Sequence, residues 1–94
     1  MSESQGKYEA AEPLFIDALQ MTKELLGDRH PSVATSLHNL GTLYYQQSKY
    51  SQAQEFISQA VEILLPVVGE QHPNVQISLW YLDQIQQAIL EQDS

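Results

Sequence analysis

Apolar side chains recur along the chain at the three- and four-residue spacing of an α-helix, in four separate segments. Gly27 and Gly69 each follow one of these segments, and Pro31 and Pro73 open the segments that come next. A glycine just past a helix readily takes the left-handed backbone that closes it, and a proline is tolerated in a first helical turn. The pattern therefore predicts an all-α chain with helices over about residues 8–26, 32–47, 50–68 and 74–91.

The second half of the chain repeats the first at an offset of 42 residues without a gap. The matched identities are Lys7-Tyr8 with Lys49-Tyr50, Ala11 with Ala53, Ala18 with Ala60, Gly27 with Gly69, His30-Pro31-x-Val33 with His72-Pro73-x-Val75, Ser36-Leu37 with Ser78-Leu79, and Leu40 with Leu82. A fixed internal period of this length indicates a solenoid of stacked units. Each unit is a pair of helices, and the short linker at 47–51 predicts a tight antiparallel hairpin from the second and third helices.

The central part of the chain carries a family signature. Residues 37–44 read LxxLGxxY and residues 53–60 read AxxxIxxA, which resembles the two-helix signature of the tetratricopeptide repeat family. Gly41 and Ala53 are small where two helices cross closely, and Ile57 fills the space around the crossing. The period also suits HEAT and armadillo repeats, but these do not account for this spacing of residues. The 42-residue period, with LGxxHP joining the helices, resembles the variant found in kinesin light chains.

The resemblance also sets the phase of the repeat. Residues 4–8 resemble the end of the first helix type of a repeat followed by the turn into its second type. The order of helices is therefore second-type, first-type, second-type, first-type. We expect a single tetratricopeptide-like α-solenoid domain over residues 1–94, with one complete antiparallel repeat flanked by two half repeats. A naturally short protein and a terminal fragment of a longer solenoid both fit this arrangement.

Composition narrows the range of partners. The net charge is −8 and only four residues are Lys or Arg, so nucleic acid is not an expected partner. No apolar run approaches the roughly 18 residues of a membrane span, and residues 1–5 lack the features of a signal peptide, so no membrane association is expected. The absence of cysteine suits a reducing compartment, which makes the cytoplasm the expected location.

The residues that most often carry chemistry have structural explanations in this sequence. His30 and His72 occupy equivalent positions before a helix, where capping or packing is expected rather than metal binding. A hydrolytic triad would need His38 with Ser36 and Asp83, but Ser36 and His38 are two residues apart on a helix and point to different faces. The carboxylates of the second-type helices are expected on outward, solvated arcs; they are Glu9, Glu12, Asp17, Glu24, Glu55 and Glu62. We expect no enzymatic activity, no cofactor and no metal site.

The second helix has an unusual polar face. Its core arc holds Val33, Leu37, Leu40, Gly41 and Tyr44, and no Asp, Glu, Lys or Arg occurs between residues 32 and 48, although a solvated helical face normally carries charge. The equivalent arc of the fourth helix carries two large aromatic residues, which are expected to point away from the core. The resemblance to tetratricopeptide repeats implies that first-type helices line a concave groove that binds a peptide or protein segment. The expected peptide-binding residues are Thr35, His38, Asn39, Thr42, Tyr45, Ile77, Trp80, Tyr81 and Gln84.

Asn39 has the most specific expected role in this groove. Its side-chain amide both donates and accepts, so it can pair with the backbone of an extended peptide. It matches the asparagine of the LxNL element of kinesin-light-chain repeats, whereas Tyr81 replaces it in the next repeat. None of the four cations lies on a groove helix, so the acidic chaperone tails that some family members bind are poor candidates.

The first helix predicts a second function, which is self-association. At 100° per residue its apolar side chains cover about half the circumference, more than one neighbouring helix can bury, and Ile16 is expected to stand alone beyond that arc. Four helices are also few for a repeat protein. A homodimer through this helix is the alternative to groove binding, alongside a terminal fragment with no groove ligand of its own. The expected interface residues are Tyr8, Ala11, Leu14, Phe15 and Ala18.

The opposite end of the chain is expected to be a polar cap. Asp83 and Gln86 on the fourth helix replace Gly41 and Tyr44 of the second helix, at the positions that press on a following helix. A charge there would lose its water if another helix packed closely. The fourth helix is therefore expected to present a polar outer face.

Overall fold

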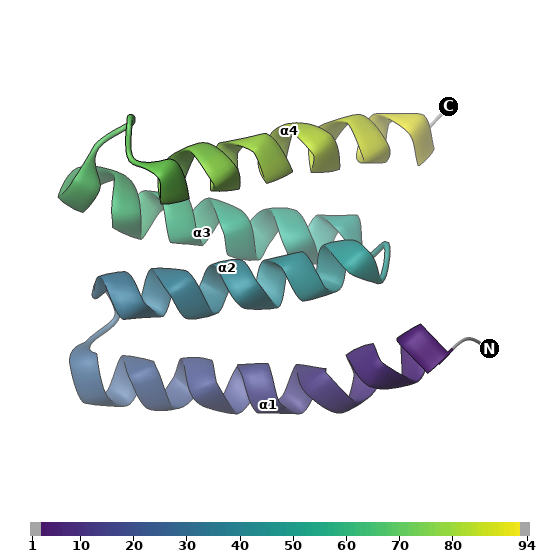
Figure 1. Cartoon of the computed structure of the whole chain (residues 1–94), viewed down its shortest axis with the longest axis horizontal. Coiled ribbons are helices and arrows are strands. Elements are labelled where there is room, and N and C mark those ends of the chain that lie inside the picture. Colours follow the sequence, from purple (N-terminus) through teal and green to yellow (C-terminus); the bar gives the residue numbers. More distant parts are fainter. Residues whose placement is uncertain (1–2, 93–94) are drawn as a thin grey trace.

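The computed structural model describes residues 3–92, with side chains from Gly6 onward (Figure 1). The fold is all-α, as the sequence predicts, and the predicted single domain at 1–94 extends beyond the described residues at both ends. The helices are α1 (Glu3–Leu26), α2 (Pro31–Gln46), α3 (Tyr50–Val68) and α4 (Pro73–Gln92).

The start of α1 differs from the sequence prediction. Residues 4–8 are helical, so the turn expected there is wrong. One exposed glycine, Gly6, interrupts this stretch, and a lone glycine in a helix costs only about 1 kcal/mol relative to alanine. The good helix formers around it, Lys7 among them, outweigh that cost.

The two longer connections, from α1 to α2 and from α3 to α4, both begin with a glycine of positive φ that ends the preceding helix. Gly27 and Gly69 have φ angles of 92° and 86°, in the left-handed region expected for them. Their backbone N–H groups donate to Lys23 O and Leu65 O, each at 2.9 Å. These bonds satisfy carbonyls that the helix ends would otherwise leave unpaired.

The histidines before α2 and α4 are caps, which confirms the role expected for them. The Nδ1 atom of His30 accepts the Ser32 N–H at 3.0 Å, and the Nδ1 atom of His72 accepts the Asn74 N–H at 3.1 Å. A side-chain acceptor at this position satisfies one of the orphaned donors of the first helical turn. The imidazoles therefore cap these helices in the way that serine or aspartate side chains usually do.

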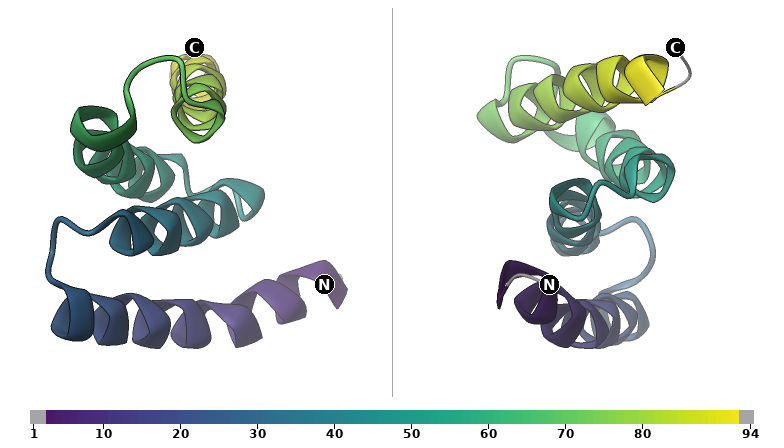
Figure 2. Two further views of the ribbon diagram at one scale, coloured as in Figure 1. Left: turned by 60° about the vertical axis from the view of Figure 1, so that its left-hand side comes forward. Right: turned by 90° about the vertical axis from the view of Figure 1, so that its right-hand side faces the viewer.

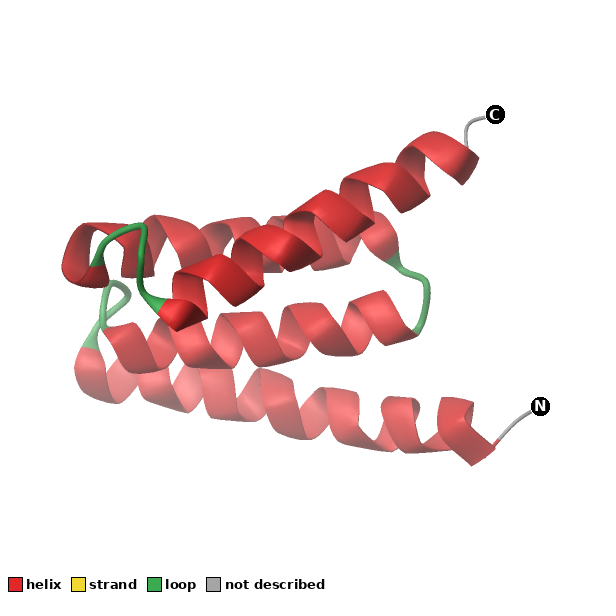
Figure 3. Cartoon of the chain, turned by 45° about the horizontal axis from the view of Figure 1, so that its top comes forward, coloured by secondary structure: helices red, strands yellow, loops and turns green. Residues whose placement is uncertain are grey.

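Successive helices run antiparallel and stack one on the next (Figures 1 and 3). The views in Figure 2 show α2 between α1 and α3, with α4 packed on α3. The first-type helices α2 and α4 also touch. They therefore share one side of the stack, with the second-type helix α3 between them in the chain.

The core lies mainly between α2 and α3. The predicted core arc of α2 is buried, with Leu37 and Leu40 each 1% exposed. A methyl group on Gly41 would overlap Cγ1 of Ile57 and lie 3.3 Å from the carbonyl oxygen of Ala53. The close crossing of α2 and α3 therefore requires glycine at position 41.

Candidate functional site

A pocket of about 260 Å³ lies between the first halves of α2 and α4, against the second half of α3. We call it the inner pocket. Its floor contains the buried residues Ala34, Ala60 and Leu64, whose small or aliphatic side chains leave the space open. The complete lining is Ala34, Thr35, His38, Asn39, Ala60, Leu64, Asn74, Ile77 and Ser78.

His38 joins the two helices at the edge of the inner pocket. Its Nδ1 atom lies 3.0 Å from Ser78 Oγ, a hydrogen bond between α2 and α4. Burial of the imidazole lowers the pKa of His38 from its ordinary value, because the charged form loses its water. His38 pairs with Ser78 rather than with Ser36 or Asp83, so the triad that the sequence argued against does not form.

Tyr81 is the centre of an aromatic cluster beside His38. Its ring meets His38 at 5.5 Å, Tyr45 at 5.6 Å and Trp80 at 5.1 Å between centroids, in each case edge to face. Such pairs add stability beyond the area they bury. Tyr81 is half-buried against the core, so the expectation that it points away from the core is wrong, whereas Trp80 is 55% exposed. The repeat offset could not reveal this difference, because Tyr81 fills the gap between α2 and α4.

A second hollow, of about 500 Å³ and more open, runs between α1 and α2. Asn39 lines both this hollow and the inner pocket. Thr42 also lines the second hollow, and its hydroxyl donates to the Asn39 carbonyl at 2.8 Å. The complete lining is Lys7, Tyr8, Ala11, Phe15, Asn39, Thr42, Leu43 and Gln46.

The predicted groove residues are thus divided between three places. Thr35, His38, Asn39 and Ile77 line the inner pocket, Asn39 and Thr42 line the second hollow, and Tyr45, Trp80 and Tyr81 form the aromatic cluster. Gln84 is half-buried on α4 and lines neither hollow. The sequence reasoning missed Ala34, Ala60, Leu64, Asn74 and Ser78 as pocket residues. The identity of Ser36 with Ser78 marked a repeated position, but it did not show that only Ser78 meets His38.

The outer face of α1 is apolar and open. Leu14, Met21 and Leu25 are 67%, 61% and 75% exposed. Of the residues expected to mediate self-association, Leu14, Phe15 and Ala18 are exposed, whereas Tyr8 and Ala11 are half-buried against α2. The expectation for Ile16 is wrong, because its side chain packs against the core. The side of α1 that carries Ile16 packs against α2, and the pattern within α1 alone does not show which side is covered.

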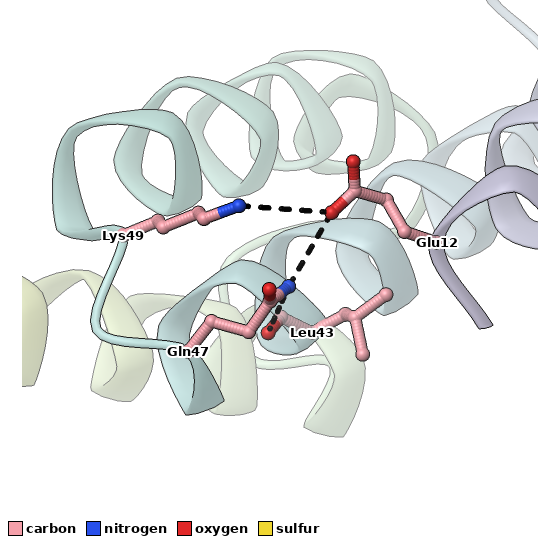
Figure 4. Close-up of polar contacts among 4 residues, drawn as sticks. All are labelled: Glu12, Leu43, Gln47 and Lys49. Atoms are coloured by element: carbon pink, nitrogen blue, oxygen red, sulfur yellow. Dashed lines mark hydrogen bonds and ion pairs between the residues drawn. The ribbon is translucent and has the colours of Figure 1, made fainter. Parts of the chain in front are cut away.

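Glu12 ties α1 to the turn between α2 and α3 (Figure 4). Its Oε1 accepts a hydrogen bond from Gln47 Nε2 at 3.4 Å and lies 4.0 Å from Lys49 Nζ. Glu12 is therefore not on an outward arc, and that prediction is wrong. Burial, followed by the negative charge of Glu12 and its hydrogen bond, raises the pKa of Tyr44.

Metal ligands do not gather in the described part of the chain. Across residues 3–92, no group of three or more His, Asp or Glu side chains is placed to hold an ion. No helix of the described residues combines the length and the apolar character that crossing a bilayer requires.

Antiparallel helix pairs stacked at a fixed sequence period define a helical-repeat protein of the α-solenoid class. A family model described as tetratricopeptide repeat matches residues 2–65, and the chain belongs to that family. Repeats of this family generally mediate protein–protein interactions and are typically non-catalytic. No curated protein shows significant similarity to the chain.

Proposed function

We propose that the protein binds a segment of another protein in the groove formed by α2 and α4. The observation that carries this proposal is the combination of a pocket, an exposed tryptophan and uncharged polar side chains on the same two helices. Family membership supports a protein partner in general. The 42-residue period and the LGxxHP linker at residues 26–31, which resemble kinesin light chains, favour recognition of an extended peptide.

Trp80 is the expected anchor of this interaction. It keeps more than half of its surface exposed, although its edge is fixed against Tyr81. Large aromatic residues that become buried at an interface usually carry most of the binding energy. Asn39 contributes less, because it offers hydrogen bonds that water already satisfies in the free protein.

A pull-down from lysate of the source organism, followed by calorimetry with the retained partner, tests the proposal. Trp80→Ala should weaken binding by about 2 kcal/mol or more without loss of helicity, and Asn39→Ala should weaken it less. Val67→Ala is the matched control, because Val67 is an exposed apolar residue on α3 away from the groove. Equal affinity of all three variants and the unaltered protein would overturn groove binding.

Self-association through α1 is the second candidate function. The repeat offset makes Phe15 and Ala18 equivalent to Ile57 and Ala60 of α3, which are almost completely buried. The face of α1 that lies open is thus the one that a neighbouring helix covers on α3. A specific interface buries at least ~1,000 Å² in total, and in a symmetric pair each α1 face would supply half of that area.

A twofold arrangement is favoured over a head-to-tail chain. In a head-to-tail chain, α4 of one copy would take the place on α1 that α2 has on α3. Asp83 would then meet Phe15 where Gly41 meets Ile57, and even a methyl group does not fit at that crossing. Docking of two α1 helices avoids this clash.

Sedimentation at micromolar concentration tests the second candidate. The unaltered chain should sediment as a dimer and Leu14→Glu as a monomer, because Leu14 is exposed in the middle of α1 and a charge there would have to be desolvated in the interface. Leu90→Glu on α4 is the matched control, at a leucine that is also exposed. A monomer for the unaltered chain would remove this candidate.

The absence of cysteine supports a cytoplasmic location for either function.

A further inference from the structure

The inner pocket has properties that restrict what the groove can bind. We propose that it receives one uncharged aliphatic side chain of the bound segment, while Asn39 and Asn74 pair with the peptide groups on either side of that side chain. This inference rests on the proposed groove function and names the chemistry of the ligand.

The size of the pocket fits a single side chain. Its volume of about 260 Å³ is below the ~300 Å³ at which sites for whole small molecules begin. The floor is built from Ala34, Ala60 and Leu64, each less than 10% exposed, so the inner end of an inserted group leaves water there. Transfer of an aliphatic side chain from water to this floor lowers the free energy.

Among the described residues, the pocket has no charged residue that could pair with a charged side chain. Its described lining contains no Asp, Glu, Lys or Arg, and the nearest titratable group, His38, is already bonded to Ser78. The Tyr81 ring, which packs on His38 from α4, is neutral as well. A carboxylate or an ammonium group would lose water here without gaining an oppositely charged partner.

The rim of the pocket has the groups that hold a peptide backbone. Asn39 on α2 and Asn74 on α4 are exposed, and neither side-chain amide forms a hydrogen bond within the described part of the chain. Each amide donates and accepts, which matches the N–H and C=O of a peptide group. Thr35 is less available, because its hydroxyl donates to Pro31 O at 3.4 Å.

Blocked amino acids test the proposal without knowledge of the natural partner. The probes are the N-acetyl N-methylamides of leucine, norleucine, lysine and glutamate, titrated into the full chain and followed by amide chemical shifts. Leucine and norleucine should saturate with shifts at Thr35, His38 and Ser78. The lysine probe differs from norleucine by its terminal ammonium group and should bind at least tenfold more weakly, as should the glutamate probe.

Two variants show whether these shifts come from the pocket. Thr35→Trp places a large ring on the rim at an exposed position and should abolish saturation by leucine, whereas Ser51→Trp, at an exposed position of α3, should leave it unchanged. Binding of the lysine probe as tight as that of norleucine, or leucine binding that survives Thr35→Trp, would overturn the proposal.

Failure of this inference is distinguishable from failure of groove binding. If Trp80→Ala releases the natural partner but no aliphatic probe saturates, the groove stands and the pocket assignment is wrong. If the aliphatic probes bind but neither Trp80→Ala nor Thr35→Trp affects the natural partner, groove binding of that partner is wrong, and the ligand class with it.

Discussion

Gln54 donates a hydrogen bond from Nε2 to Gln86 Oε1 at 3.0 Å, and these residues stand 42 positions after Glu12 and Tyr44. Glu12 and Tyr44 are likewise placed on a second-type helix and the next first-type helix, and Glu12 lies close enough to raise the pKa of Tyr44. The polar contact is repeated while its chemistry changes from a carboxylate beside a neutral phenol to a pair of amides. It fixes how α1 lies on α2 and how α3 lies on α4.

The raised pKa of Tyr44 gives a direct test of the first of these contacts. Glu12→Gln removes the negative charge and should bring the pKa of Tyr44 down towards its ordinary value of 10.0, leaving the part due to burial. An NMR titration of the tyrosine rings checks this. Glu55→Gln, on an exposed carboxylate of α3, is the control and should not move the pKa of Tyr44. No change in Glu12→Gln would mean that burial alone raises it.

Gly41→Ala should lower the free energy of unfolding by about 2 kcal/mol, because the added methyl group overlaps Ile57 at the crossing of α2 and α3. Urea denaturation measures the change. Gly6→Ala is the control, since nothing lies within 4 Å of a methyl group at that helical position, and it should stabilise the protein by up to about 1 kcal/mol. If both substitutions stabilise, the helices do not cross as closely as described.

Asp83 occupies the position equivalent to Gly41, but we expect a substitution of Asp83 to have little effect on stability. It is exposed on α4 and accepts a hydrogen bond from Gln87 Nε2, one turn later, at 3.2 Å. Asp83→Ala should change the free energy of unfolding by less than about 0.5 kcal/mol, as for other surface sites. A drop in Tm of several degrees would show that the carboxylate has a structural partner.

The sequence predicts a polar outer face for α4, but this face is not entirely polar, because Leu79 and Leu90 are exposed on this helix.

His38 should make stability depend on pH. Burial places the pKa of His38 below its ordinary value of 6.5, so the unfolded chain binds a proton more readily than the folded one. The contribution of neutral His38 to the free energy of unfolding is fully present above about pH 6.5 and is lost as the pH falls below that value. His38→Gln should show a smaller loss of Tm between pH 7.5 and 5 than the unaltered protein. An identical loss in both would exclude His38 as its source.

The parts of the fold that the sequence predicted depend on local rules. Gly27 and Gly69 close helices because glycine takes a left-handed backbone readily, and His30 and His72 cap helices because their side chains reach nearby N–H groups. These features follow from neighbours in the sequence. The repeat period then fixed the order of the helix types.

The errors concern how one helix lies on another. The angles of Ile16 and Glu12 around an isolated helix predict exposure, but their burial depends on which side of α1 packs against α2. The repeat offset matches Tyr81 to the exposed Asn39, yet the Tyr81 ring packs against His38 and so is half-buried. The inner pocket depends in the same way on three helices at once. A periodic pattern within one helix contains none of these relationships.

Asn39 lies on the boundary between the inner pocket and the hollow beside α1, and this position has a thermodynamic consequence. A segment bound in the groove and a helix of a second copy that enters this hollow would contact the same residue, so filling one site would alter the free energy of filling the other. Such coupling is reciprocal. If dimer formation changes the affinity for the segment by some factor, the segment must change the affinity between protomers to the same overall extent. Concentration of the protein itself would then act as a regulator of what it binds.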